Sequence, residues 1–168
     1  KQDWSFFIEF LNYLKNINNI EVIIVGEGAE KDSLLAKIKD YSFVKHYNLV
    51  PYEELPSLLS SADLHVLFQK TDVIDTVMPS KILGMMASAK PSIVTGNLKS
   101  EVATVFEESN GGFYYDGKSM EEIINQIIFL KQNKAKSLEL GQNAKEYVEE
   151  KFSKNKVLNR FINELKNF

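Results

Sequence analysis

Apolar residues along this chain recur alternately at helical and at strand spacing. Helical spacing appears first near the amino terminus, in Trp4, Phe7, Ile8, Leu11 and Leu14. Short apolar runs typical of buried strands occupy 21–25, 43–50, 64–68, 92–95 and 112–115. Amphipathic patterns predict further helices near 34–38, 53–61, 79–89, 100–107, 119–132, 136–151 and 153–167. This alternation predicts an α/β fold, an open parallel sheet with helices on both faces.

The first predicted element is a helix, whereas a βα unit normally begins with a strand. We therefore expect the strand before this helix to lie outside the sequence, with Lys1 at the end of the connecting loop. The 168 residues, 44% of them hydrophobic, are enough for a single core and predict a single domain.

Composition excludes several classes of function. A net charge of −3 and the absence of any basic block argue against a nucleic-acid-binding protein. The chain has no cysteine, which excludes disulfides and thiolate metal sites. No H-x-x-x-H pattern, EF-hand or carboxylate cluster is present, so we expect no bound metal. No apolar run approaches the roughly 20 residues that a transmembrane helix needs.

The segment Met78-Pro79-Ser80-Lys81 predicts a helix start suited to an anion. Proline fits the first turn of a helix because its missing N–H would have no partner there. The following N–H groups lie at the positive end of the helix dipole, and Ser80 and Lys81 add a hydroxyl and an ammonium group. The segment predicts a phosphate site, with an ordinary capped helix as the alternative.

Ligands of open parallel sheets bind at the carboxyl ends of the strands. Four predicted loops should meet there: 26–29, 48–52, 69–80 and 96–99. In the first of them, Gly26-Glu27-Gly28 permits close backbone approach to a ligand, although a tight turn without a ligand explains it equally well. A dinucleotide fingerprint would need a small residue in place of Lys31 and an acid near Asn48, so we do not expect NAD.

The ionisable residues form no familiar hydrolytic set. His46 and His65 fall in predicted strands, where packed histidines are more common than catalytic ones. Asp72 and Asp75 lie in the long polar loop, either solvated or in contact with substrate hydroxyls. Met85 and Met86 are predicted core residues.

In ordered motifs over nearly its whole length, the chain resembles the C-terminal, nucleotide-sugar-binding half of GT-B glycosyltransferases of the retaining family 4. The matching motifs are Val25-Gly26-Glu27-Gly28, Leu49-Val50-Pro51, 58–68, Pro79-Ser80-Lys81, Met86-Ala87, Lys90-Pro91 and Gly111-Gly112-Phe113. The Met-Pro-Ser-Lys form is closest to bacterial capsule, O-antigen and colanic-acid transferases. Members of that subgroup commonly use fucose-type sugars.

The resemblance implies a site and a reaction. The implied donor-binding residues are Lys1, Gly26, Glu27, Gly28, Leu49, Val50, Thr76, Val77, Met78, Pro79, Ser80, Lys81 and Gly84. The donor would be a UDP- or GDP-sugar, with a hexose or deoxyhexose transferred to a surface-polysaccharide precursor without a metal or other cofactor. Thr76 and Gly84 occupy the positions of the two family glutamates, so the usual contact to the ribose hydroxyls is missing.

The resemblance also implies a two-part protein. Residues 1–150 form the Rossmann-like donor domain, and residues 151–168 form a C-terminal helix that packs back toward an absent N-terminal acceptor domain. Alternatively, the apolar stripe of that helix packs on the donor domain; the stripe comprises Val157, Leu158, Phe161, Ile162 and Leu165. We expect the catalytic residues in the absent domain, so this fragment alone should be inactive.

Two functions remain open at this point. The first is the donor half of a transferase in the cytoplasm, working at the inner face of the membrane when its acceptor is lipid-linked. The second is a non-catalytic nucleotide-binding or regulatory module derived from a transferase domain. The sequence decides neither the sugar nor the base of the donor.

Overall fold

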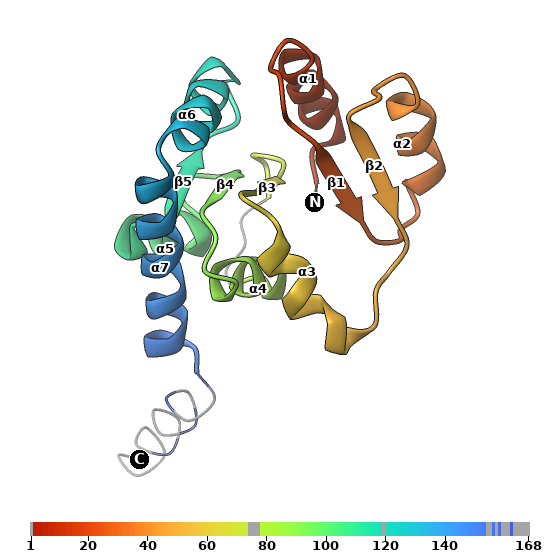
Figure 1. Cartoon of the computed structure of the whole chain (residues 1–168). Helices are drawn as coiled ribbons and strands as arrows, with labels where there is room; N and C mark the ends of the chain where they lie inside the picture. Colours follow the sequence, from red (N-terminus) through yellow and green to blue (C-terminus); the bar gives the residue numbers. More distant parts are fainter. Residues whose placement is uncertain are drawn as a thin grey trace.

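The computed structural model describes residues 2–73, 78–118 and 120–153, together with Lys156, Leu158 and Ile162 (Figure 1). The predicted site residues Lys1, Thr76 and Val77 therefore lie outside the described residues. So do Asp75, Ser119 at the start of the helix expected near 119–132, and most of the helix expected over 153–167.

The helices and strands follow the predicted order. They are α1 (Trp4–Leu14), β1 (Val22–Val25), α2 (Lys31–Ile38), β2 (Val44–Tyr47), a 3₁₀ turn η1 (Tyr52–Glu54), α3 (Leu55–Ser61), β3 (His65–Phe68), α4 (Ser80–Ala87), β4 (Ser92–Thr95), α5 (Glu101–Ser109), β5 (Gly112–Tyr115), α6 (Met120–Gln132) and α7 (Lys134–Lys151). Asp3 caps α1 by accepting a hydrogen bond from the Phe6 N–H at 3.0 Å. The predicted α/β class is confirmed.

Two of the boundaries that differ from the sequence prediction lie beside the expected site. The strand expected over 43–50 is only Val44–Tyr47, because it pairs residue for residue with the four-residue β1. Pro79 precedes α4 as its N-cap rather than standing in its first turn, and its carbonyl accepts from the N–H groups of Ile82 and Leu83. Proline therefore still marks the helix start, but α4 begins at Ser80, one residue later than the sequence predicted.

All described strands are parallel, but they form two sheets rather than one. The β1 strand pairs with β2, while β3, β4 and β5 form a second sheet with β4 in the middle. In Figure 1 the β1–β2 pair stands apart from the other three strands. The predicted parallel arrangement is therefore confirmed, and the described strands are divided between two sheets.

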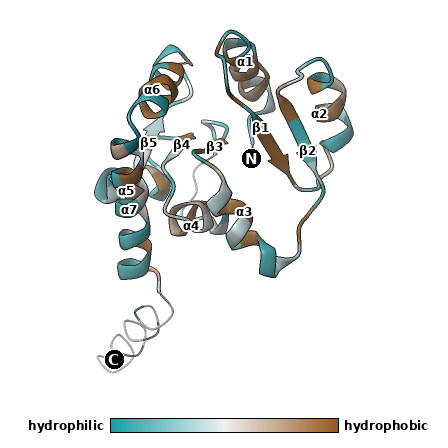
Figure 2. Cartoon of the chain, in the orientation of Figure 1, coloured by the Kyte–Doolittle hydropathy of each residue, from teal (hydrophilic) through white to brown (hydrophobic). Residues whose placement is uncertain are grey.

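Two apolar cores lie on opposite faces of the three-stranded sheet. Because side chains alternate along a strand, Ile93 of β4 joins the core with α1 and α6, and Val94 joins the core with α4, α5 and α7. Every residue of β4 is buried. Met85 and Met86 are buried in the second core, as predicted. Figure 2 shows the strongly apolar β1 beside the more polar β2, whose exposed Lys45 pairs with Glu21.

Helix α7 is held against the end of α4 through a glycine. An added Cβ at Gly141 would lie 2.1 Å from the carbonyl oxygen of Ala89, a residue with the left-handed φ of +57°. No larger side chain fits there without a backbone shift, so Gly141 sets the close approach of α7 to the turn after α4.

Beyond α7, Leu158 and Ile162 are the described members of the predicted apolar stripe, and both side chains are exposed. The packing partner of that helix stays a prediction. Within the described part of the chain, no helix has the length and apolar character needed to cross a membrane.

Candidate functional site

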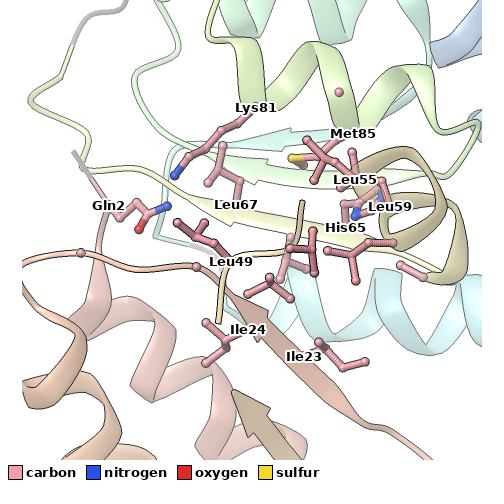
Figure 3. A pocket seen from close by; sticks show the side chains of 18 of the residues that line it. Gln2, Ile23, Ile24, Leu49, Leu55, Leu59, His65, Leu67, Lys81 and Met85 are labelled. Atoms are coloured by element: carbon pink, nitrogen blue, oxygen red, sulfur yellow. The ribbon is translucent and has the colours of Figure 1, made fainter. Parts of the chain in front are cut away.

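A cleft of about 1270 Å³ lies between the β1–β2 pair on one side and β3 with α3 and α4 on the other. Its walls include the strand edges of β1 and β3, the turn after β1, the loop after β2 and the first turns of α4. Figure 3 shows Leu49 and Lys81 in the same cleft as Ile24 and Leu67. The cleft runs along β1 and β3, and the part lined by Gly26, Leu49 and Lys81 lies at the carboxyl ends of parallel strands, where ligands of such sheets bind.

Most of the predicted site residues that the structure describes meet in this cleft. Those lining it are Gly26, Glu27, Gly28, Leu49, Val50, Ser80, Lys81 and Gly84. Met78 and Pro79 precede α4 and do not line the cleft. The loop 96–99, also expected at this edge, contacts the loop after β3 instead, where Asn97 Nδ2 donates to Thr71 O at 2.8 Å.

The turn after β1 is fixed by hydrogen bonds to β2. The Gly26 N–H donates to Tyr47 O at 3.1 Å, and His46 Nε2 donates to Gly26 O at 3.0 Å. Gly26 has φ +139°, which favours glycine, and no atom lies within 4 Å of a Cβ added at Gly28. The turn is thus held in place while its backbone stays open to a ligand.

An ion pair neutralises the acidic residue of this turn. Lys31 Nζ donates to both Glu27 carboxylate oxygens, at 2.7 and 2.9 Å, and to Asn48 Oδ1 at 3.2 Å. Lys31 and Asn48 are the two residues that depart from a dinucleotide fingerprint. In the structure they form a hydrogen bond to each other, and Lys31 also pairs with Glu27. Because Lys31 balances the charge of Glu27, an anion near this turn meets less repulsion than an isolated carboxylate would cause.

The start of α4 supplies positive potential to the cleft. No side chain caps this helix, and its first turn carries no acidic residue. The exposed Lys81 side chain extends into the cleft (Figure 3), and among the described residues it makes no hydrogen bond or ion pair. The N–H groups at the start of a helix and a lysine ammonium group beside them together form an anion-binding arrangement.

Tyr52 and Leu55 also line the cleft but are not among the donor-binding residues named from the sequence, although Tyr52 ends the loop 48–52 that was expected at this edge. Tyr52 is 84% exposed and Leu49 is 69% exposed. Exposed apolar and aromatic side chains beside a loop at the carboxyl edge suit the flat face of a nucleobase. The aromatic residue directly after the Leu49-Val50-Pro51 turn was the available signal.

His65 also lines the cleft but is held in a structural role. Its Nε2 donates to Ser88 Oγ at 3.0 Å, and Ser88 Oγ donates to Met85 O at 2.6 Å. Burial, together with the positive charge of Lys90, lowers the pKa of His65 to about 4. The imidazole is therefore neutral near pH 7, in agreement with the expected packed histidine.

We expect acid to destabilise the protein through His65. Between pH 6.5 and 4 the unfolded state binds a proton at this residue and the folded state does not, so stability falls as pH falls. With a folded pKa of about 4, the loss should reach about 2 kcal/mol at pH 5. Urea unfolding of wild type and His65→Gln between pH 7 and 5 measures it. Identical pH dependence of the two proteins would contradict this assignment.

No cluster of three or more metal-ligating His, Cys, Asp or Glu side chains occurs among the described residues. The expectation of a metal-free site stays a prediction.

Comparison with known proteins agrees with this geometry. Residues 2–147 match the protein family described as "Glycosyl transferases group 1". The chain is 28% identical over 149 residues to WcaI of Escherichia coli (strain K12), whose name refers to colanic acid biosynthesis and glycosyl transfer; the match covers 85% of this chain and 35% of WcaI. The chain thus spans about a third of the length of the curated relatives it matches.

Solved structures share the fold. Anabaena Alr3699/HepE, crystallised with UDP, superposes with a TM-score of 0.77 at 17% identity, over 98% of this chain and 45% of that one. The C-terminal domain of the group 1 glycosyl transferase LpcC from Francisella tularensis superposes with a TM-score of 0.69 at 19% identity, covering 89% of this chain and 79% of that domain. The family resemblance found in the sequence is confirmed.

Proposed function

Because the chain belongs to the group 1 glycosyltransferases, we propose that its cleft binds the nucleotide-sugar donor of a glycosyl transfer reaction. The observation that carries the proposal is the meeting of the Gly26–Gly28 turn, the Leu49–Val50 loop and the start of α4 on one cleft. The similarity of the fold to a protein crystallised with UDP supports a nucleoside diphosphate group in the donor.

The geometry suggests how the parts of the donor are distributed. The diphosphate lies against the start of α4. Its negative charge is bound there by Lys81, Ser80 and the N–H groups of the first helical turn. The base lies against the loop of Leu49 and Val50, next to Tyr52. Thr76 and Val77, outside the described residues, precede α4 in the sequence and remain proposed sugar contacts, as Lys1 remains a proposed phosphate contact.

In the proposed reaction, the bond between sugar C1 and the diphosphate oxygen breaks, and an acceptor hydroxyl oxygen forms the new bond to C1. The leaving diphosphate carries away the bonding electron pair and takes up the hydroxyl proton. Lys81 and the positive end of the α4 dipole stabilise that leaving group without requiring a metal. We also propose that the sugar keeps its configuration at C1. The catalytic residues are proposed to lie on a separate N-terminal domain.

A surface-polysaccharide precursor is the proposed acceptor, with a hexose or deoxyhexose as the transferred sugar. This choice is supported by the similarity to a protein named for colanic acid biosynthesis. The proposed location is cytoplasmic, at the inner face of the membrane if the acceptor is lipid-linked.

One observation favours a second function. Gly84 lines the cleft at the position where the resemblance expects a ribose-binding glutamate, and it offers no side chain to a ligand. A non-catalytic nucleotide-binding module derived from a transferase would be consistent with that loss.

Calorimetric titration of the full-length protein with UDP-, GDP- and dTDP-sugars separates these functions. Tight binding of one sugar on one nucleotide, followed by sugar transfer in the presence of acceptor, is expected of the donor half of a transferase. Weak binding of every UDP- and GDP-sugar, without turnover, would favour the non-catalytic module.

A further inference from the structure

The loop after β2 leaves the sheet directly beside the turn after β1. In the parallel ladder the Gly26 N–H donates to Tyr47 O at 3.1 Å, and the next bond of the ladder would join the Leu49 N–H to Gly26 O. Gly26 O instead accepts from His46 Nε2 at 3.0 Å. Residues 48–50 therefore lie outside the sheet, and strand pairing does not hold them next to the turn.

Lys31, the first residue of α2, supplies the link that strand pairing lacks. Its Nζ donates to both carboxylate oxygens of Glu27 in the turn, at 2.7 and 2.9 Å, and to Asn48 Oδ1 in the loop, at 3.2 Å. Its backbone N–H donates to Gly28 O at 3.1 Å. Among the described residues, 48–50 make no other hydrogen bond, so Lys31 alone connects this loop to the turn by a polar contact.

The surroundings of the Lys31 ammonium group suit it to hold protein groups rather than a ligand. Its side chain is 26% exposed, whereas the other lysines in ion pairs between described residues are 36–82% exposed. An ammonium group has three donors, and the three acceptors on Glu27 and Asn48 use all of them. Lys31 therefore has no donor left for direct contact with a ligand.

Both ends of this link reach the cleft. Glu27 and Lys31 line it, and so do Leu49 and Val50, which directly follow Asn48. A loop that is held in its binding position before the ligand arrives costs less to order on binding, so the link raises affinity without touching the ligand. Lys31 also balances the charge of Glu27, which would otherwise repel a diphosphate in the same cleft.

We propose that Lys31 is a positioning residue of the nucleotide site and acts through two neighbours. Through Asn48 it holds the loop that contacts the base, and through Glu27 it lowers the negative charge that a diphosphate meets. The first effect acts on nucleosides and nucleoside diphosphates alike, whereas the second acts on the diphosphate alone. This inference rests on the proposed function, because the cleft must bind a nucleotide for Lys31 to influence it.

Calorimetric titration of the full-length protein with UDP and uridine, or with GDP and guanosine where these bind more tightly, tests the proposal. Lys31→Ala should weaken diphosphate binding by about tenfold and nucleoside binding by about three- to fivefold, since each partly exposed link contributes modestly. Asn48→Ala breaks only the link to the loop and should weaken both ligands by the same factor, about three to five. Lys31→Arg keeps the charge and several donors, so both ligands should bind within about twofold of wild type.

Lys45→Ala is the matched control, because Lys45 also forms an ion pair, with Glu21, but does not line the cleft. It should leave both affinities unchanged. Wild-type affinity of Lys31→Ala or Asn48→Ala for the nucleoside would overturn the positioning role, as would equal losses in Lys31→Ala and Lys31→Arg, or in Lys31→Ala and Lys45→Ala. Each of these results leaves the proposed function intact. Failure of the wild-type protein to bind any nucleoside diphosphate would instead overturn the proposed function and this inference with it.

Discussion

Lys81→Ala is expected to weaken binding of UDP or GDP to the full-length protein by about ten- to a hundredfold. A charge-assisted contact to phosphate is typically worth about 1.5–3 kcal/mol, and a factor of ten in affinity corresponds to about 1.4 kcal/mol. The ammonium group extends into the cleft from the first turn of α4, where it acts on the same anion as the helix dipole. Calorimetric titration of both proteins with each diphosphate measures the effect.

The controls separate a phosphate contact from a general loss of charge. Lys37→Ala removes an exposed lysine from the last turn of α2, outside the cleft, and should leave affinity unchanged. Uridine and guanosine lack phosphates and should bind wild type and Lys81→Ala alike. Equal affinity of wild type and Lys81→Ala for the diphosphates would remove Lys81 from the site.

Gly141→Ala is expected to lower the free energy of unfolding by about 3 kcal/mol, the upper end of the usual range for overpacking. The added Cβ would stand 2.1 Å from the Ala89 carbonyl oxygen. That neighbour is backbone, so relief requires α7 or the turn after α4 to move. Thermal unfolding should show a drop in Tm of roughly 6–12 °C.

Gly28→Ala is the matched control for stability, because no atom lies within 4 Å of its added Cβ. Its φ lies outside the left-handed range, so the substitution should leave stability unchanged or raise it slightly. Equal Tm values for Gly141→Ala and wild type would mean that α7 does not approach Ala89 as closely as described.

The sequence located β4 and β5 best. The ranges 92–95 and 112–115 match these strands at every residue, since each run begins directly after Pro91 or Gly111 and supplies side chains to both cores. The run 43–50 was predicted too long because apolar residues continue past β2, as exposed Leu49 shows. Hydrophobicity alone therefore does not distinguish a residue that pairs within a sheet from an apolar loop residue that lines a cleft.

The division into two sheets was not predictable from periodicity. Apolar spacing predicts that β1 and β3 are strands, but it does not predict which strand edges pair, because pairing depends on tertiary contacts.

The sequence likewise predicted only part of the site. Glycines and a helix-starting proline carry local signals that located the Gly26–Gly28 turn and the start of α4. Leu55, by contrast, lines the cleft from the start of α3 and has no motif of its own.

The central claim is that the cleft between β1–β2 and α4 binds a nucleoside diphosphate. A structure of the full-length protein with UDP or GDP bound, whichever titrates more tightly, tests it most directly. We predict the diphosphate within hydrogen-bond distance of Lys81 Nζ and of the first N–H groups of α4, with the base against Leu49 and Val50. A saturating nucleotide bound outside these residues would contradict the claim.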